Sequence, residues 1–253
     1  PDGEKVYVYD YDRGLRIDSA RIADGRFTIS GSYDRNAYVR LNNGNNYCNV
    51  ELDTLAVADF ETNIPSGGSA LNRALIAQHA KEDSIHADMQ RFYAGLEQSG
   101  YSDAEKAVMF KKYFDDRRPE IISHYTDIIM AYPNGPGMRA LMELGNFPEL
   151  TPDEWDAVYS RLDPELKGTN LAAIFNDMYA SKRKSLPGMP FIDFEAKTLD
   201  GKDTSLSAYV GKGRCVVADF WASWCGPCRQ EAEDVLKPLY EKYKDDDRIS
   251  ILG

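Results

Sequence analysis

The sequence predicts a multidomain chain in which an antiparallel β-sandwich-like domain, an α-helical connector and an α/β domain follow one another. Residues 1–66 contain short runs in which apolar and polar residues alternate, a period of two that is typical of strands. Residues 67–185 carry apolar residues at helical spacing, and residues 186–253 combine strand-like runs with one helical segment. We therefore expect domain boundaries at residues 66/67 and 185/186.

Short strands dominate the first domain. They are expected over residues 6–9, 16–22, 26–30, 37–41, 47–52 and 55–60. Asp24 and Gly25 separate the second run from the third, and an Asp-Gly pair in this position is a hairpin signal. So many strands in so short a segment favour a small antiparallel sandwich or half-open barrel. Residues 64–68 are expected to form the loop that leads out of it.

The connector is predicted to consist of helices. They are expected over residues 69–98, from 102 onward, from 151 onward and over 170–184. Ser102 with Glu105, and Thr151 with Glu154, show the capping-box pattern of helix starts. Pro119 is expected to interrupt or kink the second helix, because proline removes a backbone hydrogen bond from a helix interior.

The third domain is predicted to begin with a hairpin that combines residues 191–194 with a turn at 199–202. Residues 215–221 are mostly apolar and rich in β-forming residues, which suits a central buried strand. A helix from 229 to about 244 and a strand at 249–252 complete a strand–helix–strand order.

Composition and charge exclude several classes of protein. The 30 Lys and Arg residues against 41 Asp and Glu residues give a net charge of −11, so the basic surface expected of a nucleic-acid binder is missing. No apolar stretch approaches the roughly 20 residues of a membrane-spanning helix. The 4 cysteines are too few for a disulfide-stapled scaffold, which leaves catalytic, metal-binding or buried thiols.

The candidate chemistry lies in a C-x-x-C motif. Cys225 and Cys228 are separated by Gly226 and Pro227 at the predicted junction of a strand and a helix. Cys225 would cap the helix, where free N–H groups and the helix dipole stabilise a thiolate, so Cys225 is the expected nucleophile. Cys228 is expected one turn along and more buried, placed to resolve a mixed disulfide.

These residues resemble a known family. The run DFWASWCGPC at residues 219–228 is similar to the active-site signature of thioredoxin. Pro187-Gly188, the run 191–194 and Asp200-Gly201-Lys202 resemble the TlpA/ResA branch of envelope-facing thiol:disulfide oxidoreductases, so the resemblance covers residues 187–253. It implies a partial thioredoxin-like α/β domain, the N-terminal half only. We therefore expect a fragment of a longer oxidoreductase that turns over protein disulfides poorly.

Residues 1–63 resemble, more diffusely, the β-rich domain of unknown function found ahead of such domains in bacterial envelope proteins. The resemblance thus implies a location in the periplasm or cell envelope, with a lipid anchor before processing as a further expectation. The expected partners are protein disulfide substrates and an upstream electron donor, and no cofactor is expected. Gly226-Pro227 between the cysteines is similar to thioredoxin, which favours a reductase or isomerase.

The resemblance also implies roles for individual residues. Cys225 would attack, Cys228 would resolve, and Asp219 would take the place of the buried aspartate that relays a proton to or from the second thiol. A lone acid in an apolar strand is costly to ionise, so the pKa of Asp219 is expected to rise. Glu231 matches an acidic residue beneath the cysteines. Glu233 departs from the pattern, because the branch usually carries proline there, and a straighter and more acidic helix start is expected.

Trp224, Gly226 and Pro227 are the predicted substrate-binding residues. Trp224 lies directly before the nucleophile and is expected to be an exposed platform for a substrate peptide rather than a core residue.

Two other interpretations of the cysteines are disfavoured. A zinc site would need further ligands at comparable spacing, whereas Cys48, Cys215 and the three histidines, His79, His86 and His124, are scattered over other predicted elements. No metal is therefore expected; Cys48 and Cys215 are expected to be small buried hydrophobic residues, and His79 and His86 packing or surface residues. A peroxiredoxin would need Pro and Thr or Ser where residues 218 and 222 are both Ala.

One alternative of a different class stays open. Residues 1–185 could form an envelope binding module that recognises a partner or a glycan, with a vestigial thioredoxin part. The intact C-G-P-C motif, with Asp219 in place, argues against such decay.

Overall fold

The structure is a computed structural model of the whole chain, and it describes residues 2–33, 37–133, 135–147, 150–213 and 215–253. The chain divides into two compact units, Pro1–Arg183 and Lys184–Gly253. Each unit is described by itself.

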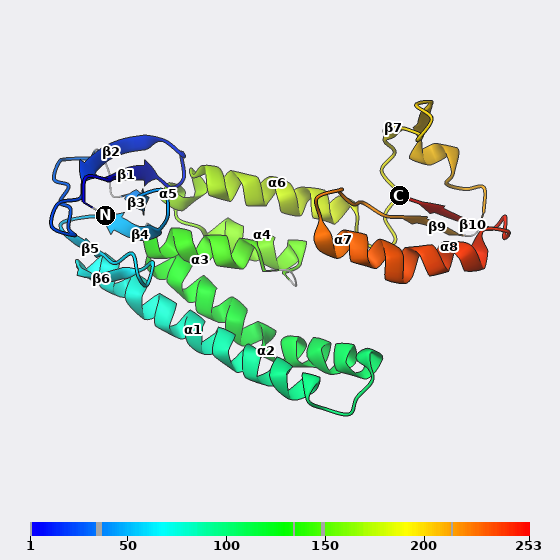
Figure 1. Cartoon of the computed structure of the whole chain (residues 1–253), viewed down its shortest axis with the longest axis horizontal. Helices are drawn as coiled ribbons and strands as arrows, with labels where there is room; N and C mark the ends of the chain where they lie inside the picture. Colours follow the sequence, from blue (N-terminus) through cyan, green and yellow to red (C-terminus); the bar gives the residue numbers. More distant parts are fainter. Residues whose placement is uncertain (1, 34–36, 134, 148–149, 214) are drawn as a thin grey trace. The chain divides into compact units, whose positions relative to one another are not determined.

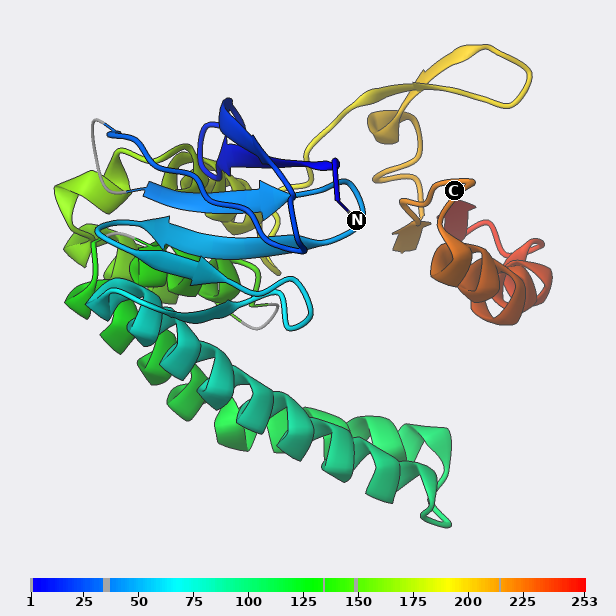
Figure 2. The same cartoon turned by 60° about the vertical axis from the view of Figure 1, so that its left-hand side comes forward.

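A four-stranded antiparallel sheet opens the first unit (Figure 2). Its strands are β1 (Lys5–Asp10), β2 (Arg16–Arg21), β3 (Ala37–Asn42) and β4 (Tyr47–Leu52), and their order in the sheet is β2-β1-β3-β4. Alternate side chains on one face form a buried apolar cluster that consists of Val6, Val8, Val39, Leu41, Cys48 and Val50. The predicted alternation is therefore confirmed for these strands: one face is covered by the apolar cluster, and the other is buried mainly at the end where Tyr38 and Glu51 lie.

The strand predicted at 26–30 is wrong. Asp24 and Gly25 form the expected turn, but it closes only one bridge, between Ala23 and Arg26. Phe27 and Ile29 are half-buried and pack against the apolar cluster of the sheet instead of joining a ladder. Their alternation therefore reflects a segment that covers a core, which produces the same sequence pattern as a strand.

The run predicted at 55–60 is shorter than expected, and its partner was missed. Strand β5 (Ala56–Ala58) pairs with β6 (Pro65–Gly68), which the sequence placed in a loop. Gly68 has a φ of 126°, and a Cβ atom there would lie 2.5 Å from the carbonyl oxygen of Leu55. Glycine permits this close approach. The described β-rich part thus consists of one four-stranded sheet and one two-stranded ribbon.

In the described part of the first unit, six helices follow the strands (Figure 1). They are α1 (Ala70–Glu97), α2 (Asp103–Ala131), α3 (Gly135–Gly145), α4 (Pro152–Arg161), α5 (Pro164–Lys167) and α6 (Asn170–Lys184). Helix α2 runs through Pro119 without ending, so of the two expected outcomes, an interruption or a kink, the interruption is wrong. Helices α3 and α5 were not predicted, because α3 begins Gly-Pro-Gly and α5 is a single turn.

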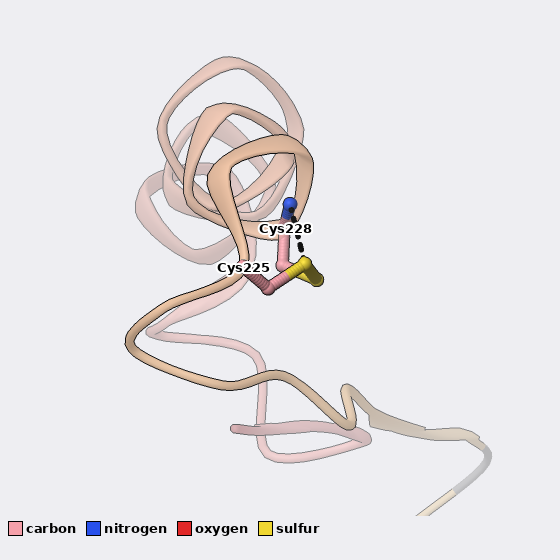
Figure 3. The surroundings of a disulfide bond; sticks show 2 residues. All are labelled: Cys225 and Cys228. Atoms are coloured by element: carbon pink, nitrogen blue, oxygen red, sulfur yellow. Dashed lines mark hydrogen bonds between the residues drawn. A yellow bond between two sulfur atoms is a disulfide. The ribbon is translucent and has the colours of Figure 1, made fainter. Parts of the chain in front are cut away.

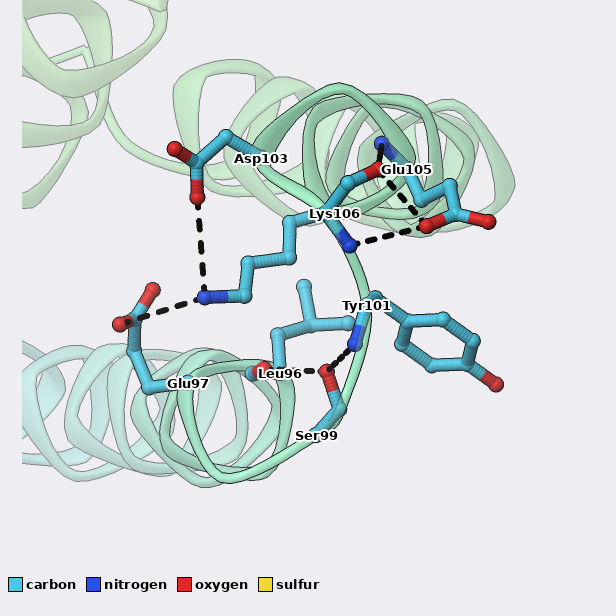
Figure 4. A network of polar contacts seen from close by, with 8 residues as sticks. Leu96, Glu97, Ser99, Tyr101, Asp103, Glu105 and Lys106 are labelled. Carbon is cyan, nitrogen blue, oxygen red and sulfur yellow. Dashed lines mark hydrogen bonds and ion pairs between the residues drawn. The ribbon is translucent and has the colours of Figure 1, made fainter.

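The capping boxes are confirmed. At the turn between α1 and α2, the backbone N–H of Glu105 donates to the Ser102 hydroxyl at 3.4 Å, and the Ser102 backbone N–H donates to the Glu105 carboxylate at 2.8 Å (Figure 4). The Lys106 ammonium bridges Glu97 and Asp103 across the same turn, at 3.7 and 3.8 Å (Figure 4). The start of α4 shows the same reciprocal pair, between Thr151 and Glu154.

Strands and helices share one core in this unit. Tyr38 of β3 belongs to the same buried cluster as Trp155 of α4 and Phe175 of α6. The carboxylate of Asp12, in the β1–β2 loop, also accepts hydrogen bonds from the backbone N–H groups of Asn170 at 3.2 Å and Leu171 at 3.0 Å. The predicted boundary at 66/67 therefore falls inside β6 and within one compact unit.

In the described part of the second unit there are two short pairs of strands, a single 3-10 turn (Leu206–Ala208) and one broken helix. Antiparallel β7 (Glu195–Lys197) and β8 (Asp203–Ser205) flank the predicted turn, and parallel β9 (Cys215–Ala218) and β10 (Ile249–Leu252) form the other pair. The helix comprises α7 (Gly226–Glu231), a π-helical turn (Ala232–Leu236) and α8 (Lys237–Tyr243). The order strand, helix, strand is confirmed.

Three details of the second unit differ from expectation. The first hairpin strand lies at 195–197 rather than 191–194, and the strand predicted at 215–221 ends at Ala218. No side chain among the described residues of this unit is buried, so β9 is not a buried strand. Cys215, expected to be buried, is exposed. Apolar sequence alone did not determine burial here, because burial also requires covering elements.

Candidate active site around Cys225 and Cys228

The turn between β9 and α7 places Cys225 at the start of a helix. The backbone N–H of Cys225 donates to the carbonyl oxygen of Ala222 at 2.9 Å, which closes a turn before the helix. The carbonyl oxygen of Cys225 accepts from the backbone N–H of Arg229 at 3.1 Å, the first hydrogen bond of α7. Pro227 occupies the first turn, where a missing N–H costs no hydrogen bond. Local geometry therefore makes Cys225 the N-cap residue, as predicted.

The two cysteines form a disulfide, with their Cα atoms 5.3 Å apart (Figure 3). The Sγ atom of Cys225 also accepts a hydrogen bond from the backbone N–H of Cys228 at 3.3 Å (Figure 3). In an ordinary N-cap, a side-chain hydroxyl or carboxylate oxygen accepts this hydrogen bond, and here the sulfur of Cys225 accepts it instead. A thiolate at the same position would receive the same N–H and face the positive end of the helix dipole.

Both cysteines are half-buried, so the expected greater burial of Cys228 is not observed. The asymmetry between them is one of hydrogen bonding: the sulfur of Cys225 receives the capping N–H, and the backbone of Cys228 supplies it.

The predicted substrate-binding residues surround the disulfide. Trp224 is 87% exposed, as expected for a platform, and Gly226 and Pro227 are exposed at the first turn of α7. Phe220 and Trp221, on the same turn, are 77% and 51% exposed. The sequence thus predicted one exposed aromatic residue here, and the structure adds two.

Asp219 lies just beyond β9 rather than inside a strand. Its backbone N–H donates to the carbonyl oxygen of Leu252 at 2.8 Å, so the backbone still follows the β9–β10 ladder. Its side chain is half-buried, not enclosed as the sequence led us to expect. No hydrogen bond joins its carboxylate to a described residue.

Glu231 and Glu233 lie on the helix after the disulfide. Glu231 ends α7 and is exposed, and within the described part of the chain its carboxylate has no hydrogen bond to either cysteine. Glu233 lies in the π-helical turn and pairs with Lys237 at 3.0 Å. The expectation of a straighter helix at this point is wrong, because a wider π turn replaces regular α geometry before Pro238.

Arg229 was missed by the sequence reasoning. It lies four residues after Cys225, one turn along α7, and side chains at this spacing share a helix face. Helical side chains also lean toward the N-terminus, so we expect its guanidinium to lie on the Cys225 side of α7. Arg229 is the only Lys or Arg between Cys215 and Leu236, a signal that the printed sequence contained.

The remaining cysteine and histidine residues lie apart from this site. Cys48 is buried in the sheet, as predicted, and burial raises the pKa of its thiol to about 11, which leaves it protonated and unreactive. Burial also lowers the pKa of His79 to about 4 and lowers the pKa of His124. Within the described part of the chain, no group of three or more His, Cys, Asp and Glu side chains could hold a metal ion.

None of the described helices combines the length and the apolar character that crossing a bilayer requires.

A disulfide-bonded cysteine pair at the N-terminus of a helix that follows a parallel strand is typical of a thioredoxin-like domain. Comparison with known proteins agrees: the model of the AhpC/TSA family matches residues 187–253. The chain therefore carries an AhpC/TSA thioredoxin-like domain at its C-terminus.

Individual relatives indicate the branch of thioredoxin-like proteins to which this domain is similar. The chain is 45% identical over 53 residues to the thioredoxin-like protein YneN of Bacillus subtilis, an alignment that covers 21% of this chain and 29% of YneN. It is 34% identical over 80 residues to the thiol-disulfide oxidoreductases ResA of Bacillus thuringiensis and Bacillus anthracis, covering 32% of this chain and 44% of ResA. The chain thus spans less than half the length of these curated relatives, and this partial homology is consistent with a TlpA/ResA-like protein. No solved structure matches the chain.

Proposed function

We propose that this protein is a thiol:disulfide oxidoreductase that exchanges disulfides with protein substrates through Cys225 and Cys228. The observation that carries the proposal is the Cys225 sulfur at the N-cap of α7, bonded both to Cys228 and to its backbone N–H. The names of the ResA relatives support the same activity. Only a thiol that is ionised near neutral pH can attack a disulfide quickly, and this position favours ionisation.

The proposed reaction has two steps. The thiolate of reduced Cys225 attacks one sulfur of a substrate disulfide, forms a mixed disulfide and releases the other substrate sulfur as a thiolate. Cys228, deprotonated in turn, attacks the Cys225 sulfur and releases the second substrate thiol. Two electrons pass from the cysteine pair to the substrate, and the product is the Cys225–Cys228 disulfide seen in the structure.

Asp219 is the proposed proton acceptor for Cys228, and Glu231 is a proposed acidic neighbour of the pair. Asp219 directly follows the strand that leads to the site, and its carboxylate is not engaged by another described residue. Glu231 lies three residues after Cys228, a spacing that places the two on one face of the helix.

Trp224, Gly226 and Pro227 are proposed to contact the substrate backbone and side chains next to its disulfide. The exposed ring of Trp224 can pack against an extended peptide, and the small Gly226 leaves the backbone beside it accessible. The Gly-Pro pair favours reduction or isomerisation, which requires an electron donor upstream of the pair. The cell envelope is the proposed location, with a lipid anchor before processing.

Trapping of reaction intermediates tests the proposal. Cys228→Ser should accumulate mixed disulfides with a protein substrate such as reduced-and-reoxidised insulin, whereas Cys225→Ser should accumulate none, because only Cys225 attacks first. Non-reducing electrophoresis after an acid quench measures both. Equal trapping by the two variants would show that Cys225 is not the specific nucleophile. If neither variant trapped a substrate, the proposed activity would be contradicted.

Asp219→Asn tests the proton acceptor separately. The variant should slow the resolving step by about tenfold or more while the first attack stays unchanged, because only proton acceptance is lost. Stopped-flow reduction of a peptide disulfide separates the two steps. An unchanged resolving rate near neutral pH would leave Asp219 with a structural role only.

A further inference from the structure

The sheet of the first unit has one face without an apolar cover. Val6 and Val8 point into the buried cluster, so the alternate residues of β1, Lys5, Tyr7 and Tyr9, lie on the opposite face. Helices cover one end of this face, where Tyr38 belongs to the helical core. At the other end, Tyr7 and Tyr9 remain half-exposed.

Strand register assembles a cluster of cations on this face. Tyr9 lies opposite Arg16 on one side and Arg40 on the other, and Lys5 lies opposite Arg21. We call this surface the basic sheet face; its side chains are Lys5, Tyr7, Tyr9, Arg16, Ser19, Arg21, Arg40, Asn42 and Tyr47. Four cations therefore gather on one side of a small sheet in a chain whose net charge is −11.

Aromatic contacts hold two of the guanidinium groups in place. The Cζ atom of Arg16 lies 5.2 Å from the centre of the Tyr7 ring. Arg40 lies over two rings, 5.1 Å from that of Tyr11 and 4.7 Å from that of Tyr47. Its Nε atom also donates to the side-chain oxygen of Asn49 at 3.2 Å. Groups fixed in this way lose less conformational entropy when they bind a ligand.

Among the described residues, no carboxylate neutralises Arg16 or Arg40. Within the described part of the chain, the only carboxylate of the strands on this face is that of Glu51, which is buried at the far end against Gly135. Arg16 and Arg40 have no ion-pair partner among the described residues, whereas Arg139 and Arg183 are paired with Glu82 and with Asp153 and Asp156. Paired arginines are thus usual in the helices and missing on the basic sheet face.

We propose that the basic sheet face is a docking surface for an acidic segment of a partner protein. Partner carboxylates would pair with Arg16 and Arg40, and the tyrosine rings would supply apolar contact. Arginine and tyrosine are the side chains that most often dominate the binding energy of protein interfaces. A nucleic acid fits less well, because the guanidinium groups of Arg16 and Arg40 already cover the ring faces of Tyr7 and Tyr47 on which bases would stack.

A defined acidic peptide tests the proposal on the full chain. We expect a fluorescein-labelled peptide of six glutamates to bind saturably at low ionic strength, as followed by fluorescence anisotropy. Arg16→Gln with Arg40→Gln should weaken this binding by about tenfold, because two ion pairs are lost. Arg16→Gln alone should weaken it by about threefold. Since Arg16 is exposed, this single variant keeps the test valid if Arg40→Gln impairs folding.

The matched control removes two positive charges elsewhere. Lys111 and Lys112 are exposed on α2 and already pair with Asp115 and Asp116, at 3.0 and 2.6 Å. Lys111→Gln with Lys112→Gln should leave the affinity within about twofold. Equal weakening by the control, no saturable binding by the unmodified chain, or equally tight binding of a labelled hexathymidylate would each overturn the proposal.

Discussion

Trp155 and Trp224 are identical side chains in opposite environments, and they show how differently the two units are built. Trp155 is 0% exposed and stacks on Tyr179 with ring centres 5.0 Å apart, inside a core to which β3 and the helices α1 to α6 contribute. Trp224 is 87% exposed beside the disulfide, in a unit whose described side chains are never buried. The first unit is organised by long-range packing, and the candidate site in the second by hydrogen bonds within one turn.

This difference separates two physical requirements. A cysteine at a helix N-cap needs only the backbone of the next four residues, so its geometry is independent of a core. A buried tryptophan depends on covering side chains from several elements. Substitutions should therefore affect stability in the first unit and chemistry in the second.

The largest expected effect is on the core of the first unit. Trp155→Ala should lower the free energy of unfolding by about 3–5 kcal/mol, because it leaves a cavity between Phe175 and Tyr179. Chemical denaturation followed by far-ultraviolet circular dichroism measures the change. Trp155→Phe, which fills much of the cavity, should cost distinctly less. A loss below about 1 kcal/mol for Trp155→Ala would contradict the packing described here.

Acid should destabilise the first unit through His79. Burial, together with the nearby charge of Arg139, lowers the pKa of His79 in the folded chain to about 4, below its usual 6.5. As the pH falls below 6.5, the unfolded chain binds the proton first, so this contribution to stability decreases until about pH 4. In the His79→Gln variant, the denaturant midpoint of unfolding should change less between pH 7 and pH 4.5 than it does in the unmodified chain. An unchanged pH dependence would show that His79 is not responsible.

A smaller effect is expected from Arg229, the cation one helical turn after the proposed nucleophile. Arg229→Gln should raise the pKa of reduced Cys225 by about half a pH unit, because loss of a nearby positive charge disfavours the thiolate. The pH dependence of iodoacetamide labelling, resolved by site, measures this pKa. Lys237→Gln is the control, since Lys237 lies in α8 and pairs with Glu233. An equal rise of the Cys225 pKa in Lys237→Gln would show that Arg229 has no specific effect on the thiolate.

The smallest effect on stability is expected at Trp224. Trp224→Ala should change the free energy of unfolding by less than about 0.5 kcal/mol, because the ring is already in solvent. The same change should slow reduction of a peptide disulfide, since the proposed docking platform is lost. Unfolding curves and exchange rates on one preparation give both values. A stability loss comparable to that of Trp155→Ala would erase the contrast between the two tryptophans.

Much of the local structure was predictable. The capping boxes at Ser102 and Thr151 and the N-cap position of Cys225 follow from residues within one helical turn of each other. The predictions that failed depend on distant partners. The run 26–30 has the sequence pattern of a strand, but no neighbouring strand pairs with it. Residues 65–68 have the sequence of a loop, but they pair with β5 and form a strand.

The sequence by itself determined that Ser102 and Thr151 begin α2 and α4, that Cys225 caps α7, and that β1 to β4 are strands with alternating apolar residues. These features depend on short-range hydrogen bonds and on a period of two or 3.6 residues. Only the tertiary structure decided that strands and helices share one core, that Cys215 is exposed, and that Lys5, Arg16, Arg21 and Arg40 meet on one face. Register and burial are set by contacts between segments far apart in the chain, and no local pattern encodes them.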